Sequence, residues 1–167
     1  YRAISLFFLR SDLIFKEGEL KEGFKERMND AKIDFSIPNS KGKSFVRLNS
    51  EIVEEEIRGI QISNLVSQVS KNKAVREKMV SIQKSYGKEN NLIMDGRDIG
   101  SIVFPNANLK FWLTASVNIR AYRRWLEFKQ KGQNIAIEKV IENINYRDKN
   151  DENREESPLV KPKNSIE

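Results

Sequence analysis

The 167 residues are enough for one domain with its own core, and a content of 38% hydrophobic and 32% charged residues is typical of a globular chain. Cysteine and histidine are both absent, which excludes disulfides, Cys/His zinc sites and Ser-His or Cys-His nucleophilic catalysis. The formal net charge of +6 favours an anionic partner, either nucleotide phosphates or nucleic acid. Neither a signal peptide nor a run of roughly 18 apolar residues is visible, so we expect a cytoplasmic protein without a membrane span.

The N-terminal half is predicted to contain helices on both sides of a small hairpin. Apolar residues crowd segment 1–15, which predicts a buried helix, and segment 16–30 is charged with helical propensity. Two alternating segments, 32–37 and 43–48, flank a turn sequence and predict an antiparallel hairpin, with a candidate third strand at 52–53. Helical spacing returns over 62–86, and Gly87 is the expected helix stop.

The C-terminal half is predicted to contain two buried strands and two helices. Short apolar runs at 92–94 and 109–113 predict the strands, and helical spacing predicts helices before and after Gly132. The order helices, strand, strand, helices indicates an α/β fold with part of a parallel sheet flanked by helices. The hairpin is then an inserted subdomain.

Charged residues follow the first of these strands directly. The apolar run ends at Asp95, and Arg97 and Asp98 come between Gly96 and Gly100. In open α/β sheets, ligands bind at the carboxyl ends of the strands. An arginine at this edge indicates an anionic ligand, most often a phosphate.

Two further groups of charges lie on the predicted C-terminal helices. With about 100° per helical residue, Arg147, Asp151 and Arg154 share one face. That face is either an ion-pair ladder or a site that binds a phosphate and a sugar hydroxyl. The other group, Arg120, Arg123 and Arg124, forms either a solvated basic face or a lid over transferring phosphates. The remaining candidates are uninformative by themselves: Arg2, Ser67 and Arg76.

The segments DGRDIGSIVFP (95–105) and YRDKNDENREESPL (146–159) resemble bacterial cytidylate kinase, the (d)CMP kinase family. The strand segment at 110–116, the arginine-rich segment at 119–124, Tyr1-Arg2-Ala3, Ser67-Gln68-Val69 and Val75-Arg76 match the same family in the same order. The resemblance therefore extends over essentially the whole chain.

The resemblance implies an incomplete P-loop nucleoside-monophosphate-kinase domain over 1–167. It further implies a nucleotide-binding subdomain with the small antiparallel sheet at about 25–88, and lid helices at about 117–150. The implied reaction transfers the γ-phosphoryl group of ATP to CMP or dCMP in pyrimidine metabolism. Mg²⁺ would accompany ATP without metal ligands from this chain, and the protein would act as a monomer.

The resemblance also implies a role for each candidate residue. The CMP phosphate would be held by Arg2, Arg97 and Arg154. Asp151 with Arg147 would contact the sugar, while Ser67, Arg76 and Asp98 would read the cytosine edge. Arg120, Arg123 and Arg124 would close over ATP, and Arg147 would also serve the transferring phosphoryl group.

The chain departs from the family in one motif. No G-x-x-x-x-G-K-[ST] occurs in it, so the P-loop that cradles the ATP phosphates is missing from these 167 residues. We therefore expect the chain alone to be inactive, and we expect it to be a piece of a longer polypeptide. Two alternatives stay open: a kinase that prefers UMP or AMP, and a basic module that binds nucleic acid.

Overall fold

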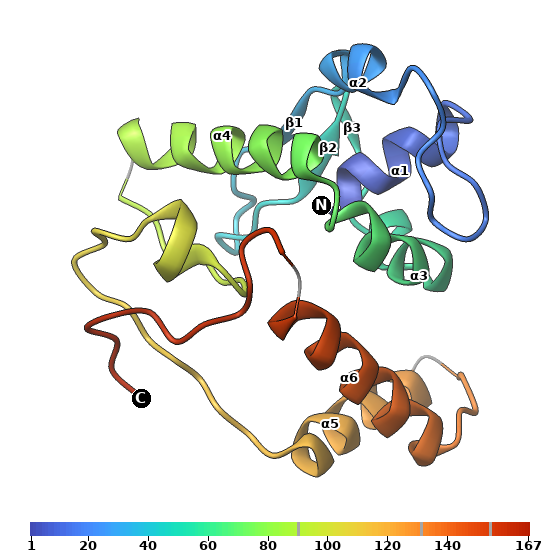
Figure 1. Ribbon diagram of the computed structural model, residues 1–167, viewed down its shortest axis with the longest axis vertical. Helices are drawn as coiled ribbons and strands as arrows, with labels where there is room; N and C mark the ends of the chain where they lie inside the picture. The colour runs from blue at the N-terminus through green and yellow to red at the C-terminus, as the bar shows by residue number, and fades with distance from the viewer. Residues whose placement is uncertain (90, 131, 154) are drawn as a thin grey trace. The chain divides into compact units, whose positions relative to one another are not determined.

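The computed structural model describes residues 1–89, 91–130, 132–153 and 155–167, which form two compact units, Tyr1–Ser81 and Ile82–Glu167. In the first unit, helix α1 (Arg2–Arg10) is followed by α2 (Phe24–Arg27), η1 (Met28–Asp30), η2 (Glu56–Arg58) and α3 (Ile60–Val69) (Figure 1). Helix α4 (Lys73–Glu89) contributes its first residues to this unit. The helices expected over 1–15 and 16–30 are shorter than predicted, because the segment 11–23 between them contains turns and an isolated bridge from Ile14 to Leu20.

Helix α1 is the centre of the first unit. Its residues Ala3 to Phe8 are all buried, and it packs against α3, η2 and strand β2 (Val46–Leu48). Phe8 and Ile4 are completely excluded from solvent, as are Val69 of α3 and Val75 of α4. The apolar residues of segment 1–15, which predicted a buried helix, therefore form the core of this unit.

The predicted hairpin forms a three-stranded antiparallel sheet. Strand β1 (Ile33–Phe35) pairs with β2, and β2 pairs with β3 (Glu51–Ile52) in the order β1-β2-β3. The register places Ile33 opposite Leu48. The Asp34–Arg47 pair beside it adds an ion pair, with Arg47 Nε 2.7 Å from Asp34 Oδ1.

The second unit contains two helices of similar length, α5 (Val117–Gln130) and α6 (Ile137–Glu152), which pack on each other. Their shared core contains Ala121 of α5 with Val140 and Ile144 of α6. Trp125 packs against this cluster, and its indole N–H donates to the carbonyl of Ile135 at 3.0 Å. A π-helical turn, η3 (Ile99–Val103), precedes them in the chain.

The buried strands predicted at 92–94 and 109–113 do not form as such. Among the described residues, 92–94 has no regular secondary structure and pairs in no sheet, and Ile93 is fully exposed. Phe111 makes one isolated parallel bridge to Ile166, and Leu113 is almost fully exposed. An apolar run becomes a buried strand only when neighbouring strands bind its backbone and helices cover its faces. The described residues provide neither, so the expected parallel sheet is not formed within them.

The sequence predicted that the helix ends at Gly87, and this prediction is wrong. Helix α4 continues through it to Glu89. The glycine is instead at a close approach, because a Cβ there would lie 2.5 Å from Cε1 of Phe104. Within the part of the chain that the structure describes, no helix is long and apolar enough to cross a membrane.

Candidate functional site

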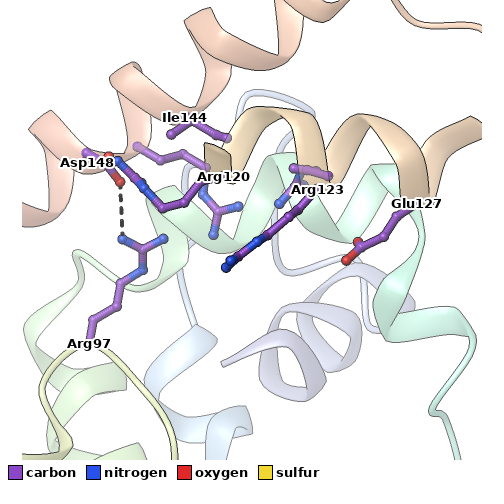
Figure 2. A pocket seen from close by; sticks show the side chains of 8 residues that line it. Arg97, Arg120, Arg123, Glu127, Ile144 and Asp148 are labelled. Carbon is purple, nitrogen blue, oxygen red and sulfur yellow. Dashed lines mark hydrogen bonds and ion pairs between the residues drawn. The ribbon is translucent and has the colours of Figure 1, made fainter. Parts of the chain in front are cut away.

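A polar pocket of about 250 Å³ lies within the second unit. Three segments form it: the loop before η3, helix α5 and helix α6 (Figure 2). The residues that line it are Arg97, Arg120, Arg123, Arg124, Glu127, Ile144, Arg147 and Asp148. Five guanidinium groups thus share one cavity with two carboxylates, which leaves it strongly positive.

The backbone of the DGRDIG segment positions Arg97. The carbonyl of Asp98 accepts hydrogen bonds from the N–H groups of Ile102 at 2.9 Å and Val103 at 3.2 Å, and these bonds start the π-helical turn. Asp98 is only 6% exposed, so the loop is anchored next to Arg97. π-helical turns of this kind are often found at functional sites.

Helices α5 and α6 present the other charges because their apolar faces pack together. Ala121 is completely buried in that interface, and Arg120 beside it reaches the pocket. Arg120 Nε donates to the carbonyl of Ala115 at 2.9 Å, and Arg120 Nη1 donates to Asp148 Oδ2 at 2.7 Å. The guanidinium group of Arg120 is therefore held from two sides.

Two aspartates of α6 hold Arg97. Arg97 Nη1 lies 2.6 Å from Asp151 Oδ2 and 3.6 Å from Asp148 Oδ1. Asp148 and Asp151 are three residues apart and share one helix face. Arg97 and Arg120 point toward Asp148 in Figure 2, which makes this carboxylate common to both arginines.

The structure brings together most of the site residues predicted in the C-terminal half. Arg97, Arg120, Arg123, Arg124 and Arg147 line the same pocket, and Asp151 adjoins it through Arg97. Asp98 is buried in the loop behind Arg97 and does not line the pocket. Arg154 lies outside the described residues.

The other three predicted site residues lie in the first unit. Arg2 Nη1 donates to the carbonyl of Ile57 and to the hydroxyl of Ser63, both at 2.9 Å. Arg76 is 4% exposed, packs on the ring of Tyr1 and donates to the carbonyl of Ser70 at 3.1 Å. Ser67 is half-buried one turn before Ser70.

The sequence analysis did not single out Asp148 or Glu127. The signal for Asp148 was available, because it precedes Asp151 by three residues and follows Arg147 directly. For Glu127 no such signal exists, since it is one of many charged residues on α5.

The donor set of the pocket does not fit a divalent cation. Its two carboxylates are outnumbered by guanidinium groups, and Asp148 is already engaged by two of them. No cluster of three or more acidic side chains placed to hold a metal occurs in the described part of the chain. The pocket is suited to anions with several oxygens, such as phosphates.

The fold and the pocket define an α/β protein in which five guanidinium groups line one pocket. The family model described as cytidylate kinase matches residues 1–167. The cytidylate kinase of Flavobacterium johnsoniae is 41% identical over 167 residues, which is 100% of this chain and 73% of that protein. The cytidylate kinase of Clostridioides difficile is 42% identical over 168 residues (100% and 73%), and that of Bacteroides fragilis is 40% identical over 166 residues (99% and 72%).

The chain therefore belongs to the cytidylate kinase family, and the resemblance seen in the sequence is confirmed. Membership implies the P-loop nucleoside-monophosphate-kinase fold. The α/β class, the small antiparallel sheet and the several helices are seen directly. The subdomain at about 25–88 and the lid at about 117–150 stay predictions.

Proposed function

We propose that this chain carries the acceptor and lid parts of a kinase that transfers the γ-phosphoryl group of ATP to CMP or dCMP. Family membership supports nucleoside monophosphate phosphorylation as the reaction class. The observation that carries the proposal is the pocket in which five guanidinium groups from three segments surround a space of about 250 Å³. A pocket of this charge stabilises phosphate oxygens in both the ground state and the transition state.

The chemistry of this reaction matches the residues present. An oxygen of the acceptor phosphate forms a bond to the γ-phosphorus of ATP, and the bond from that phosphorus to the bridging oxygen of ADP breaks in line. The acceptor is already anionic near neutral pH, so no histidine is required as a base. Arg120, Arg123 and Arg124 are proposed to neutralise charge on the transferring group, with Arg147 beside it. Mg²⁺ bound to ATP supplies further neutralisation from the substrate side.

The acceptor is proposed to bind through the residues that the family resemblance implies. Arg97, with Arg2 and Arg154, would hold its phosphate, and Asp151 with Arg147 would contact the sugar. The 2.6 Å pair between Arg97 and Asp151 supports a common acceptor site for these two residues. Ser67, Arg76 and Asp98 are proposed to read the base, because a donor and an acceptor together match the amide-like edge of cytosine.

The two alternative functions differ from the proposed one in the ligand that the protein binds most tightly. A kinase for UMP or AMP would use the same phosphate pocket with another base preference. A nucleic-acid module would need a contiguous basic stripe with exposed aromatic platforms. The arginine pocket with paired aspartates favours a mononucleotide, and we expect a monomer.

A thermal-shift panel tests the proposal, with CMP, dCMP, UMP and AMP as ligands. A ligand that binds only the folded state raises the unfolding midpoint, so CMP or dCMP at about 100 times its Kd is expected to raise it by about 5 °C or more. Arg97→Ala is expected to reduce that shift. Arg27→Ala, which removes an exposed arginine paired with Asp30 on the neighbouring η1, is the control and should keep it. Equal shifts with all four nucleotides would contradict the base preference.

A further inference from the structure

Asp148 has an unusual position for a carboxylate in a phosphate pocket. It lies on α6 with its side chain 21% exposed and lines the cavity. Its Oδ2 accepts from Arg120 Nη1 at 2.7 Å, while its Oδ1 lies 3.6 Å from Arg97 Nη1. One carboxylate thus faces guanidinium groups from a loop and from a different helix (Figure 2).

Four of the five arginines of the pocket fall into two groups. Arg97 and Arg120 are both in ion pairs with aspartates of α6. Arg123 and Arg124 form no ion pair within the described part of the chain, and Arg124 instead packs over the ring of Phe128. An incoming phosphate therefore meets ready donors on Arg123 and Arg124, but donors already in use on Arg97 and Arg120.

We propose that Asp148 is an internal counter-ion that an incoming phosphate must displace from Arg97 and Arg120. Its Oδ2 occupies a donor of Arg120 at 2.7 Å, and its Oδ1 lies within ion-pair distance of Arg97, at 3.6 Å from Nη1. Phosphate binding is therefore an exchange of one anion for another. The exchange is favourable only when the ligand brings more charge and more acceptor oxygens than one carboxylate. Asp148 then holds both arginines in position and selects for ligands with several phosphate charges over a single weakly charged anion.

The inference rests on the proposed function in one respect, namely that this pocket binds phosphates. It assigns Asp148 a role as a positioning and specificity-determining residue, since Asp148 touches the arginines and not the reacting atoms. A different role would be a purely structural link between α5, α6 and the loop. The two roles predict opposite effects of neutralising Asp148 on anion binding.

The test compares Asp148→Asn with the wild-type chain by isothermal titration with inorganic pyrophosphate and inorganic phosphate. Asparagine keeps a carbonyl oxygen for Arg120 but removes the competing charge. Removing the negative charge of Asp148 from the pocket should tighten pyrophosphate binding about three- to tenfold at low salt, and less at higher ionic strength. Inorganic phosphate should gain more than pyrophosphate, so that the preference for pyrophosphate becomes smaller.

Two variants serve as controls. Asp148→Glu keeps the negative charge and should keep the wild-type preference for pyrophosphate over inorganic phosphate. Asp34→Asn neutralises an aspartate that is paired with Arg47 on the hairpin, and it should leave both affinities within about twofold of wild type because it lines no part of the pocket.

Unchanged or weaker pyrophosphate binding in Asp148→Asn would overturn the inference and leave phosphate binding by the pocket intact. Absence of pyrophosphate binding in both wild type and Asp148→Asn would instead remove the phosphate-binding role, and the inference with it. Should Asp148→Asn fail to fold, the arginine Nε–Hε resonances of the wild-type chain decide. Pyrophosphate is expected to shift those of Arg97 and Arg120 together, and shifts confined to Arg123 and Arg124 would overturn the exchange.

Discussion

Glu54 is a buried carboxylate that joins two parts of the first unit. It is 9% exposed, and its Oε1 accepts from Arg58 Nε at 2.9 Å while its Oε2 accepts from the backbone N–H of Val46 at 3.1 Å. The hydrogen bond from Arg58, and secondly that from Val46, holds the pKa of Glu54 below its usual value of 4.5. The bonds connect strand β2 to the turn η2 that packs against α1.

This residue makes the stability of the chain depend on pH. A carboxyl group whose pKa is lower in the folded state binds fewer protons there than in the unfolded state. Its contribution is therefore complete above pH 4.5 and is lost as the pH falls through the lower pKa of the folded state. We expect Glu54→Gln to lower the unfolding free energy by about 1–2 kcal/mol at pH 7 and to flatten its acid dependence.

Urea denaturation between pH 3 and pH 7 measures both effects. Glu55→Gln changes the neighbouring exposed carboxylate, which forms no ion pair with the described residues, and it is the matched control. An acid dependence of Glu54→Gln as steep as that of Glu55→Gln would show that Glu54 does not carry the effect.

At the scale of elements, the pairing of α5 with α6 decides where the pocket charges lie. The helices meet through Ala121, Val140 and Ile144, and Ile144 also forms part of the pocket wall. Arg120 and Asp148 lie next to this core on their respective helices, so packing sets the distance between them. The pocket is a consequence of helix packing, since neither helix alone could place both charges.

We expect Val140→Ala to destabilise the second unit without changing the pocket lining. Val140 is 3% exposed in the helix interface, and removing its two methyl groups leaves a cavity that lowers the unfolding free energy by about 1–3 kcal/mol. Trp125 packs on the same cluster and provides the fluorescence signal for denaturation. Lys139→Ala, at the exposed neighbouring position, should change stability by less than about 0.5 kcal/mol. Equal losses in the two variants would place the helix interface elsewhere.

At the scale of the whole molecule, the 167 residues bear an arginine pocket but no G-x-x-x-x-G-K-[ST] motif. Such a loop places backbone N–H groups and a lysine around the β- and γ-phosphates of ATP, and positioning supplies most of the catalysis in phosphoryl transfer. We propose that the chain by itself forms no CDP from CMP, ATP and Mg²⁺ above background. The Flavobacterium johnsoniae cytidylate kinase under the same conditions is the positive control, with CDP measured by chromatography. Appreciable CDP from this chain would contradict the proposal.

The amino-acid sequence by itself determined the local elements and the chemical family. The spacing of apolar residues was enough to predict α1, the hairpin strands, α5 and α6. Each of these elements buries apolar side chains that lie close together in the sequence. The motifs DGRDIG and RDKNDENR were enough for the family, which whole-chain similarity confirmed. Two of the arginines that line the pocket, Arg97 and Arg147, lie in these motifs, and the other three lie in the arginine-rich segment 119–124.

Tertiary structure decided which charges meet and which apolar runs become strands. The segments 92–94 and 109–113 have strand-like sequences, yet a strand depends on partners that its own residues do not specify. Gly87 had the sequence of a helix stop but the role of a contact with Phe104, which only packing creates. Asp148 acquired its importance in the same way, because ion pairing with Arg97 and Arg120 depends on three segments meeting within ion-pair distance.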